Sequence, residues 1–211
     1  MYKKILFIII TIFSLSSLSF CQTFGISGSK MWTNSSDLKN PIGFNILLEK
    51  NIFTSGKITL EYSYYQNKQG NYGHFSSGIN PNIPIEENIE SLAYLHSFEF
   101  ALQYNFINFS DINLAVGGGF IVINLNQKNE GAVTKKISHF DDTRLGLVGL
   151  IQLETAESLL SPFSLFIVGK IKTTKSFVVT TEVTAPFGGA ITYKTIQFGV
   201  KYNLDKMLNR I

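Results

Sequence analysis

Apolar and polar side chains alternate along much of this chain, and the alternation is longest between residues 92 and 125. From Leu92 to Phe106, one parity is almost entirely apolar or aromatic, whereas the other holds mostly small and polar residues. A short polar turn follows, and alternation resumes from Ile112 to Leu125. Successive side chains of a strand point to opposite faces, so this stretch predicts two long β-strands joined by a tight hairpin.

Alternating segments recur along the rest of the chain after residue 21, and we count eight of them. They span residues 22–33, 41–51, 57–66, 92–106, 112–125, 142–154, 163–175 and 190–204. Short connections alternate with longer ones, of which the longest are 67–90, 126–141 and 173–189. The even number of long strands and the unequal connections predict an all-β fold, an antiparallel up-and-down transmembrane β-barrel with short periplasmic turns and longer external loops.

Two of the long connections carry expectations of their own. Pro81, Pro84 and several glycines and asparagines predict that 67–90 contains no further strand pair. The connection 173–189 contains a β-prone run, Ser176 to Thr184, before Pro186 interrupts it. The seventh strand is therefore expected to project beyond the membrane and to expose an edge that recruits a surface protein by strand addition. A plain long hairpin loop is the alternative.

Which face of the barrel points outward needs a separate argument, because alternation alone is symmetric. The charged residues gather on one parity, and we expect them to form a polar network in the barrel interior: Glu49, Glu61, Glu99, Arg144, Glu154, Lys170 and Lys201. A narrow eight-stranded interior lets such charges pair with one another. The long, continuous apolar rows favour a lipid-facing exterior. A soluble, lipocalin-like barrel with the apolar face inside is the alternative.

The N-terminus and the charge balance bound the location of the protein. Lys3 and Lys4 precede an apolar run that is too short to span a bilayer as a helix, which predicts a cleaved signal peptide over residues 1–21. Lipidation of Cys21 is the competing interpretation, although Phe20 is bulky for a lipobox. The barrel would then occupy 22–204 and a short tail 205–211. With 18 basic and 15 acidic residues in all, the chain carries no nucleic-acid footprint.

At this point the chain resembles the small eight-stranded bacterial outer-membrane barrels, such as outer membrane protein X and the transmembrane domain of outer membrane protein A. The resemblance covers residues 22–204 and rests on the signal peptide, the strand rhythm and the alternating last strand. Phe198, Val200, Tyr202 and Leu204 look like the closing-strand signal of that family. The resemblance implies a location in the outer membrane of a Gram-negative cell, contact with its lipid, and recognition by the barrel-assembly machinery during biogenesis.

Candidate catalytic and metal-binding residues are few. His96 lies on the presumed lipid-facing parity, whereas its neighbour Ser97 points to the other face, so the two do not form a catalytic pair. His139, Asp141 and Asp142 lie together in a long connection, with His74 in another, but ligand-like residues on loops are common. We therefore assign no catalytic, cofactor-binding or metal-binding residue. The run Gly117–Gly119 lacks the lysine and helix of a phosphate loop and indicates close packing in the barrel wall.

The function expected from these observations is a structural or surface-interaction role, without enzymatic activity and without a cofactor. The expected Glu, Arg and Lys network would fill the interior. A small-molecule porin or transport barrel is the main alternative. A lipid-modifying outer-membrane enzyme and a soluble lipocalin-like binder are further ones.

Overall fold

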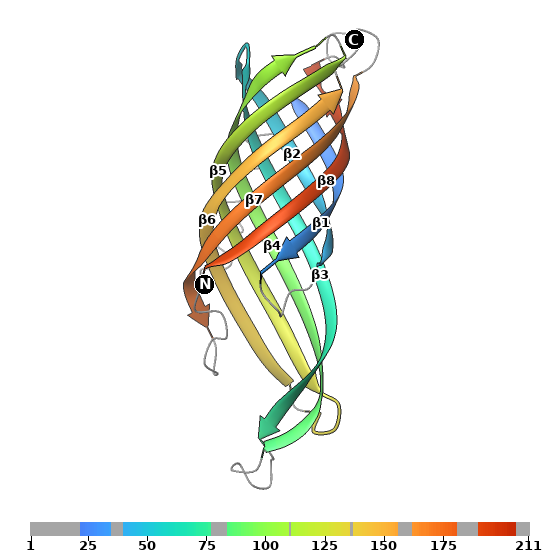
Figure 1. Cartoon of the computed structure of the whole chain (residues 1–211), viewed down its shortest axis with the longest axis vertical. Helices are drawn as coiled ribbons and strands as arrows, with labels where there is room; N and C mark the ends of the chain where they lie inside the picture. Colours follow the sequence, from blue (N-terminus) through green and yellow to red (C-terminus); the bar gives the residue numbers. More distant parts are fainter. Residues whose placement is uncertain are drawn as a thin grey trace.

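The computed structural model is a closed barrel in which each strand pairs antiparallel with its neighbours in the chain (Figure 1). It describes residues 22–34, 40–76, 84–109, 111–135, 137–155, 162–180 and 190–205, with side chains outside 69–76, 84–87 and 176–180. The strands are β1 (Thr23–Thr33), β2 (Ile42–Phe53), β3 (Gly56–Ser76), β4 (Pro84–Asn108), β5 (Ile112–Gly131), β6 (Ile137–Thr155), β7 (Phe163–Thr180) and β8 (Ile191–Asn203). The predicted all-β, eight-stranded up-and-down barrel is confirmed.

The barrel closes where the first strand meets the last. β1 pairs with β8 from Thr23 opposite Asn203 to Thr33 opposite Tyr193. The start of β1 and the end of β8 therefore lie at the same end of the barrel, together with the tight β2–β3 and β4–β5 turns. We call this the short-turn end, and the opposite one the long-hairpin end. No helix in the described part of the chain is long and apolar enough to span a membrane.

The connection 67–90 differs from its prediction. β3 continues to Ser76 and β4 begins at Pro84, and the two strands pair in an unbroken register as far as Ser76 opposite Pro84. The expectation of no strand pair within 67–90 was therefore wrong. Pro84 is compatible with the strand because it stands at its first position, where a proline interrupts no continuing ladder; Pro81 lies outside the described residues.

The long hairpins project well past the rest of the barrel (Figure 1). The pairing of β2 with β3 stops at Ile42 opposite Gln66, and beyond Gln66 the described register pairs β3 with β4 alone. β5 and β6 also continue, to Gly131 and from Ile137, so the connection 126–141 is shorter than predicted. We call the part of β3–β6 that lies beyond Gln66 of β3, and beyond the residues in register with it on β4, β5 and β6, the projecting sheet.

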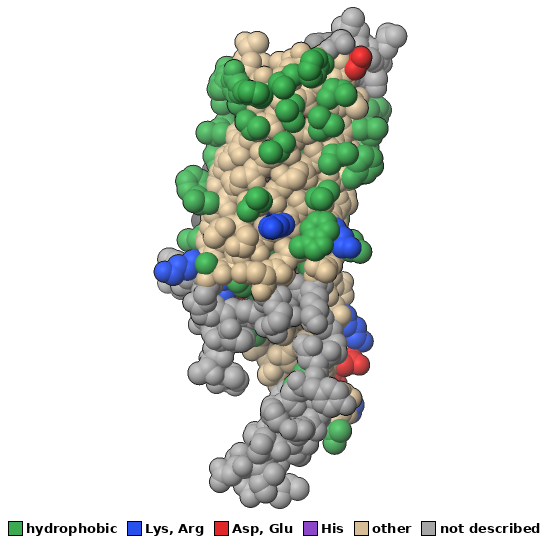
Figure 2. Space-filling model, viewed as in Figure 1, with side chains coloured by type: hydrophobic (Ala, Val, Ile, Leu, Met, Phe, Trp, Pro, Cys, Tyr) green, Lys and Arg blue, Asp and Glu red, His purple; other side chains and the backbone are tan. Residues whose placement is uncertain are grey.

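The alternation of the sequence maps directly onto the two faces of the wall. Along β8, buried and exposed residues alternate from Ile191 to Lys201. The exposed parity carries the large apolar side chains, which form a belt around the barrel (Figure 2). This placement is the reverse of the lipocalin-like alternative, in which the apolar residues would line the interior.

The glycine run of β5 has a packing role. A Cβ atom added at Gly119 would collide with the backbone of Phe100 and Ala101 on β4. One at Gly117 would meet the carbonyl of Leu102 and the side chain of Gln103. These inward-facing glycines therefore allow β4 and β5 to curve tightly against each other, which is the close packing predicted for them.

Three sequence predictions lie outside the described residues. These are the signal peptide with Cys21, the tail beyond Asp205, and the part of the connection 173–189 from residue 181 to residue 189.

Candidate functional site

The most elaborate chemistry of the described residues lies inside the barrel. Five carboxylates and five cations face the lumen, and all are buried or nearly so. They are Glu49, Glu61, Glu99, Asp142, Glu154, Lys57, Arg144, Lys170, Lys172 and Lys201. Their formal charges cancel. Burial of this many charges is tolerable only when each is paired and hydrogen-bonded, so the geometry of the pairs decides what the interior does.

A ring of four charges lies near the short-turn end; we call it the short-turn cluster. The Nζ atom of Lys201 lies 2.8 Å from carboxylate oxygens of both Glu49 and Glu154. The Nζ atom of Lys57 lies 3.2 Å from carboxylate oxygens of the same two residues. Ser164 donates a further hydrogen bond of 2.7 Å to Glu154. Each lysine therefore bridges two carboxylates, and the ring ties together β2, β3, β6 and β8.

A second group, the central cluster, has its members on β3, β4, β7 and β8. Glu61 on β3 and Glu99 on β4 are directly opposite in the register. Lys170 on β7 contacts both, at 2.7 Å and 2.8 Å. Lys172 forms an ion pair with Glu99, and Gln197 donates a 2.7 Å hydrogen bond to Glu61. The cluster thus connects the β3–β4 side of the barrel with the β7–β8 side through the lumen.

A third group is an ion pair whose two members both belong to β6. Arg144 Nε donates to Asp142 Oδ2 at 2.6 Å, and neither side chain is exposed to solvent. The two residues are separated by one position, so both point into the lumen from the same face of the strand.

Apolar side chains pack among these charges. Five buried residues form one apolar cluster, namely Leu47, Ala101, Leu150, Phe166 and Val168. A larger cluster includes Tyr65, Leu95, Ile121, Ile123 and Tyr193. The Lys201 ammonium also lies 4.9 Å from the ring centroid of Phe166, which joins the short-turn cluster to the first apolar group. The interior therefore consists of interleaved ionic and apolar packing.

All seven residues expected in the interior network are placed on the lumen face, in three separate groups. Sequence reasoning missed three of their partners: Lys57, Lys172 and Asp142. Lys57 and Lys172 lie on the same parity as the residues that were identified, which is the signal that would have found them. Asp142 was grouped with His139 and Asp141 of the preceding connection, although it is the first residue of the predicted strand 142–154 and shares the parity of Arg144.

The two histidines whose side chains are described, His96 and His139, both lie on the outer face of the barrel. His96 faces outward, and its Nδ1 atom lies 2.8 Å from the Tyr62 hydroxyl, whereas Ser97 is buried inside. His139 lies on the outer face of β6, opposite in parity to the buried Asp142. Among the described residues, no three histidine, cysteine or acidic side chains are grouped so that they could hold a metal ion.

The expected closing-strand residues are on the outer face. Phe198 and Val200 are exposed, and the Tyr202 ring packs against Phe163 of β7 with centroids 5.0 Å apart. Leu204 lies just after the end of β8. Its backbone N–H donates a 2.8 Å hydrogen bond to the carbonyl of Gln22, which extends the β1–β8 seam by one step.

Solved structures with the same architecture are membrane proteins of bacteria. Neisserial surface protein A superposes with a TM-score of 0.56 at 12% identity, covering 86% of this chain and 96% of that one. Ail, the attachment invasion locus protein of Yersinia pestis, gives 0.50 at 11%, with 85% and 95% covered. A major outer membrane protein from Thermus thermophilus gives 0.51 at 10%, with 85% and 98% covered. No family model and no curated sequence matches the chain. Identities this low show a shared fold.

Proposed function

Because the chain has the fold of the small eight-stranded outer-membrane β-barrels, we propose that it resides in a bacterial outer membrane as a closed structural barrel. Its role is to hold the projecting sheet at the surface for contact with another protein. The short-turn end faces the periplasm and the long-hairpin end faces outward, as the length asymmetry favours. The proposal assigns the protein no catalytic activity.

The projecting sheet is the observation that carries the interaction role. Over Asn67–Ser76, the described register gives β3 a partner on one side only. β7 behaves similarly, since its pairing with β8 ends at Thr174 opposite Ile191 while it continues along β6 to Thr180. Strand edges of this kind present backbone N–H and C=O groups to an incoming strand. The edge of β7 supports the partner surface expected at 173–189, and the edge of β3 adds a second candidate surface for a partner protein.

The interior supports the structural role over the porin alternative. Its charges are paired with one another, several of them across the lumen, and apolar clusters pack among them, as described above. Eight strands enclose an interior just wide enough for side chains to fill. A barrel of this kind serves as a rigid support rather than as a conduit.

The interaction role is tested by shortening one hairpin. Replacing residues 70–90 with an Asn-Gly turn keeps the β3–β4 register up to Gln69 opposite Ser91 and removes the outer part of the β3–β4 hairpin from the projecting sheet. Cells displaying the native chain and the shortened chain at equal levels are compared for adhesion to a panel of immobilised surface and matrix proteins. Binding that only the native chain supports is the expected result. Equal binding by both chains contradicts the role of this sheet.

The location is tested on the same cells. The protein should fractionate with the outer membrane and migrate differently on a gel before and after boiling. Soluble periplasmic protein would contradict the proposed location, whatever the adhesion result.

A further inference from the structure

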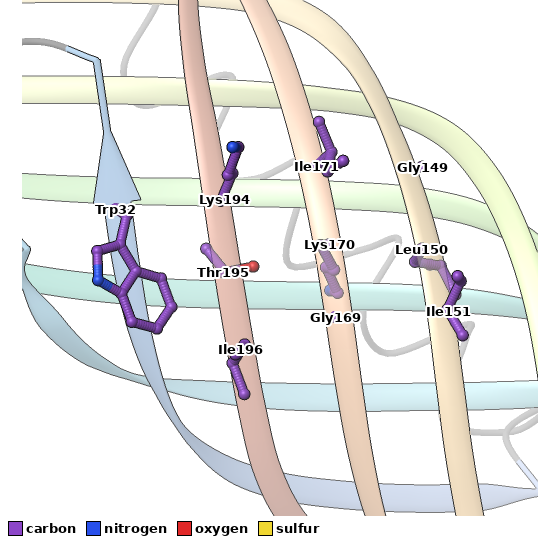
Figure 3. A pocket seen from close by; sticks show the side chains of 10 residues that line it. All are labelled: Trp32, Gly149, Leu150, Ile151, Gly169, Lys170, Ile171, Lys194, Thr195 and Ile196. Carbon is purple, nitrogen blue, oxygen red and sulfur yellow. The ribbon is translucent and has the colours of Figure 1, made fainter.

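The outer wall of the barrel has a hollow of about 560 Å³ over β6, β7, β8 and the end of β1 (Figure 3). Gly149 and Gly169 form part of its floor, and nothing lies within 4 Å of a Cβ atom added at either. Ile151, Ile171 and Ile196 border it. Two outward-facing glycines among exposed isoleucines leave a depression in an otherwise continuous apolar belt.

Cations lie beside the hollow, on its β1 side and toward the long-hairpin end. Lys194 lines the hollow and is opposite Trp32 in the β1–β8 register. Lys30 lies 5.6 Å from the centroid of the Trp32 ring. Lys175 faces outward on β7, further toward the long-hairpin end. Among the described outward-facing residues of β1, β7 and β8, these three lysines carry the only charges, and no described carboxylate forms an ion pair with Lys194.

An apolar depression with cations on one margin has the chemistry of a phosphorylated lipid site. We infer that this hollow binds an anionic phospholipid of the external leaflet, with an acyl chain over Gly149 and Gly169 and the phosphate beside Lys194 and Lys30. The inference rests on the membrane orientation proposed above. Lysines near a membrane surface attract anionic headgroups, each by a factor of about five. The glycine floor adds contact area for the chain, because methylene groups enter space that a side chain would otherwise fill.

Trp32 makes the site directly observable. It is the single tryptophan of the chain and it lines the hollow. The protein is reconstituted in phosphatidylcholine bilayers containing small fractions of phosphatidic acid with dibrominated acyl chains, and quenching of Trp32 fluorescence is recorded. Dibrominated phosphatidylcholine is the reference. Half-maximal quenching should need an at least about fivefold lower fraction of the phosphatidic acid.

Three variants separate the site from general membrane contact. Lys194→Gln should reduce the preference for phosphatidic acid by about fivefold. Gly169→Leu should remove it by filling the hollow. Gly28→Leu is the matched control, because Gly28 is also outward-facing and open but does not line the hollow; it should leave the preference unchanged.

Several results would overturn the inference. Equal quenching by the two brominated lipids in the native protein would show that the wall is bathed by lipid without selection. If neither lipid quenches Trp32, the outer wall does not contact acyl chains, and this result would count against the proposed membrane location itself. Self-association in bilayers that Gly169→Leu abolishes would assign the hollow to a second copy of the chain.

Discussion

Glu61 and Glu99 face each other directly across the β3–β4 ladder, and both are buried in the barrel interior. Like charges in this position repel each other, and the repulsion is severe away from water. The Lys170 ammonium lies between them, 2.7 Å from one carboxylate and 2.8 Å from the other. The stability of the barrel wall at this point therefore depends on a cation supplied from β7, on the far side of the lumen.

Removing that cation should destabilise the barrel strongly. Lys170→Met leaves Glu61 facing Glu99 with only Lys172 to compensate, and loss of one partner from a buried ion pair costs about 3–5 kcal/mol. Urea unfolding in lipid vesicles, followed by circular dichroism, measures the change. Lys175→Gln is the control, because Lys175 lies on the same strand but faces outward and is exposed.

The double variant Lys170→Met/Glu61→Gln identifies the cause. Neutralising Glu61 removes the repulsion, so it should recover part of the stability lost in the single variant. If the two substitutions are simply additive, the loss comes from packing and not from the opposed carboxylates.

Two glycines on neighbouring strands should respond oppositely to the same substitution. At Gly119, alanine would place its Cβ against the backbone of β4, where neither partner can yield, whereas the site at Gly149 is open. Gly119→Ala should cost about 1–3 kcal/mol or prevent folding, and Gly149→Ala should fold like the native chain. Gel mobility of unheated protein reports the folded fraction. Equal folding of the two variants would contradict the packing role of Gly119.

The barrel wall could be predicted from sequence because a strict period of two encodes it. Along each strand the outward-facing and lumen-facing residues separate by parity, so the number of strands and the faces of residues such as Phe198 and Lys201 follow from the pattern. The strand ends could not be predicted. In the run from Gln66 to Ser76 most residues are polar, so the alternation of apolar and polar residues ends although the hydrogen-bonded ladder continues.

The interior pairs could be predicted as a group but not one by one. Lys170 and Glu99 are 71 residues apart in the sequence, and they meet because strand tilt and register bring β7 across the lumen to β4. The alternation along one strand tells which face a residue is on, but not which residue of a strand across the lumen it will meet. Asp142 shows a related failure: because it was grouped with the acidic residue of the preceding connection, it was not recognised as the buried partner of Arg144, although both lie on one parity of the predicted strand 142–154.

Conductance distinguishes the structural role from the porin alternative. The native protein should be silent in planar bilayers. Lys57→Ala/Glu154→Ala removes two members of the short-turn cluster, yet it should also be silent, because Phe166, Leu150 and the central cluster still fill the interior. Single-channel recording is the measurement, with a known porin as the positive control. Ohmic steps that appear in this variant alone would identify the short-turn cluster as a gate and would favour transport.

The outward direction of the apolar rows is tested by one charge on the belt. Phe120 of β5 is 67% exposed and lies opposite Leu147 of β6, another exposed apolar residue. A lysine near the bilayer midplane of a barrel costs about 2–4 kcal/mol, so Phe120→Lys should lower the free energy of unfolding in vesicles by an amount in this range. Val133→Lys is the control, since Val133 is 74% exposed but lies in the β5–β6 turn, where water solvates the ammonium. A neutral effect at Phe120, equal to that at Val133, would mean that this face meets water and that the barrel does not use it to contact lipid.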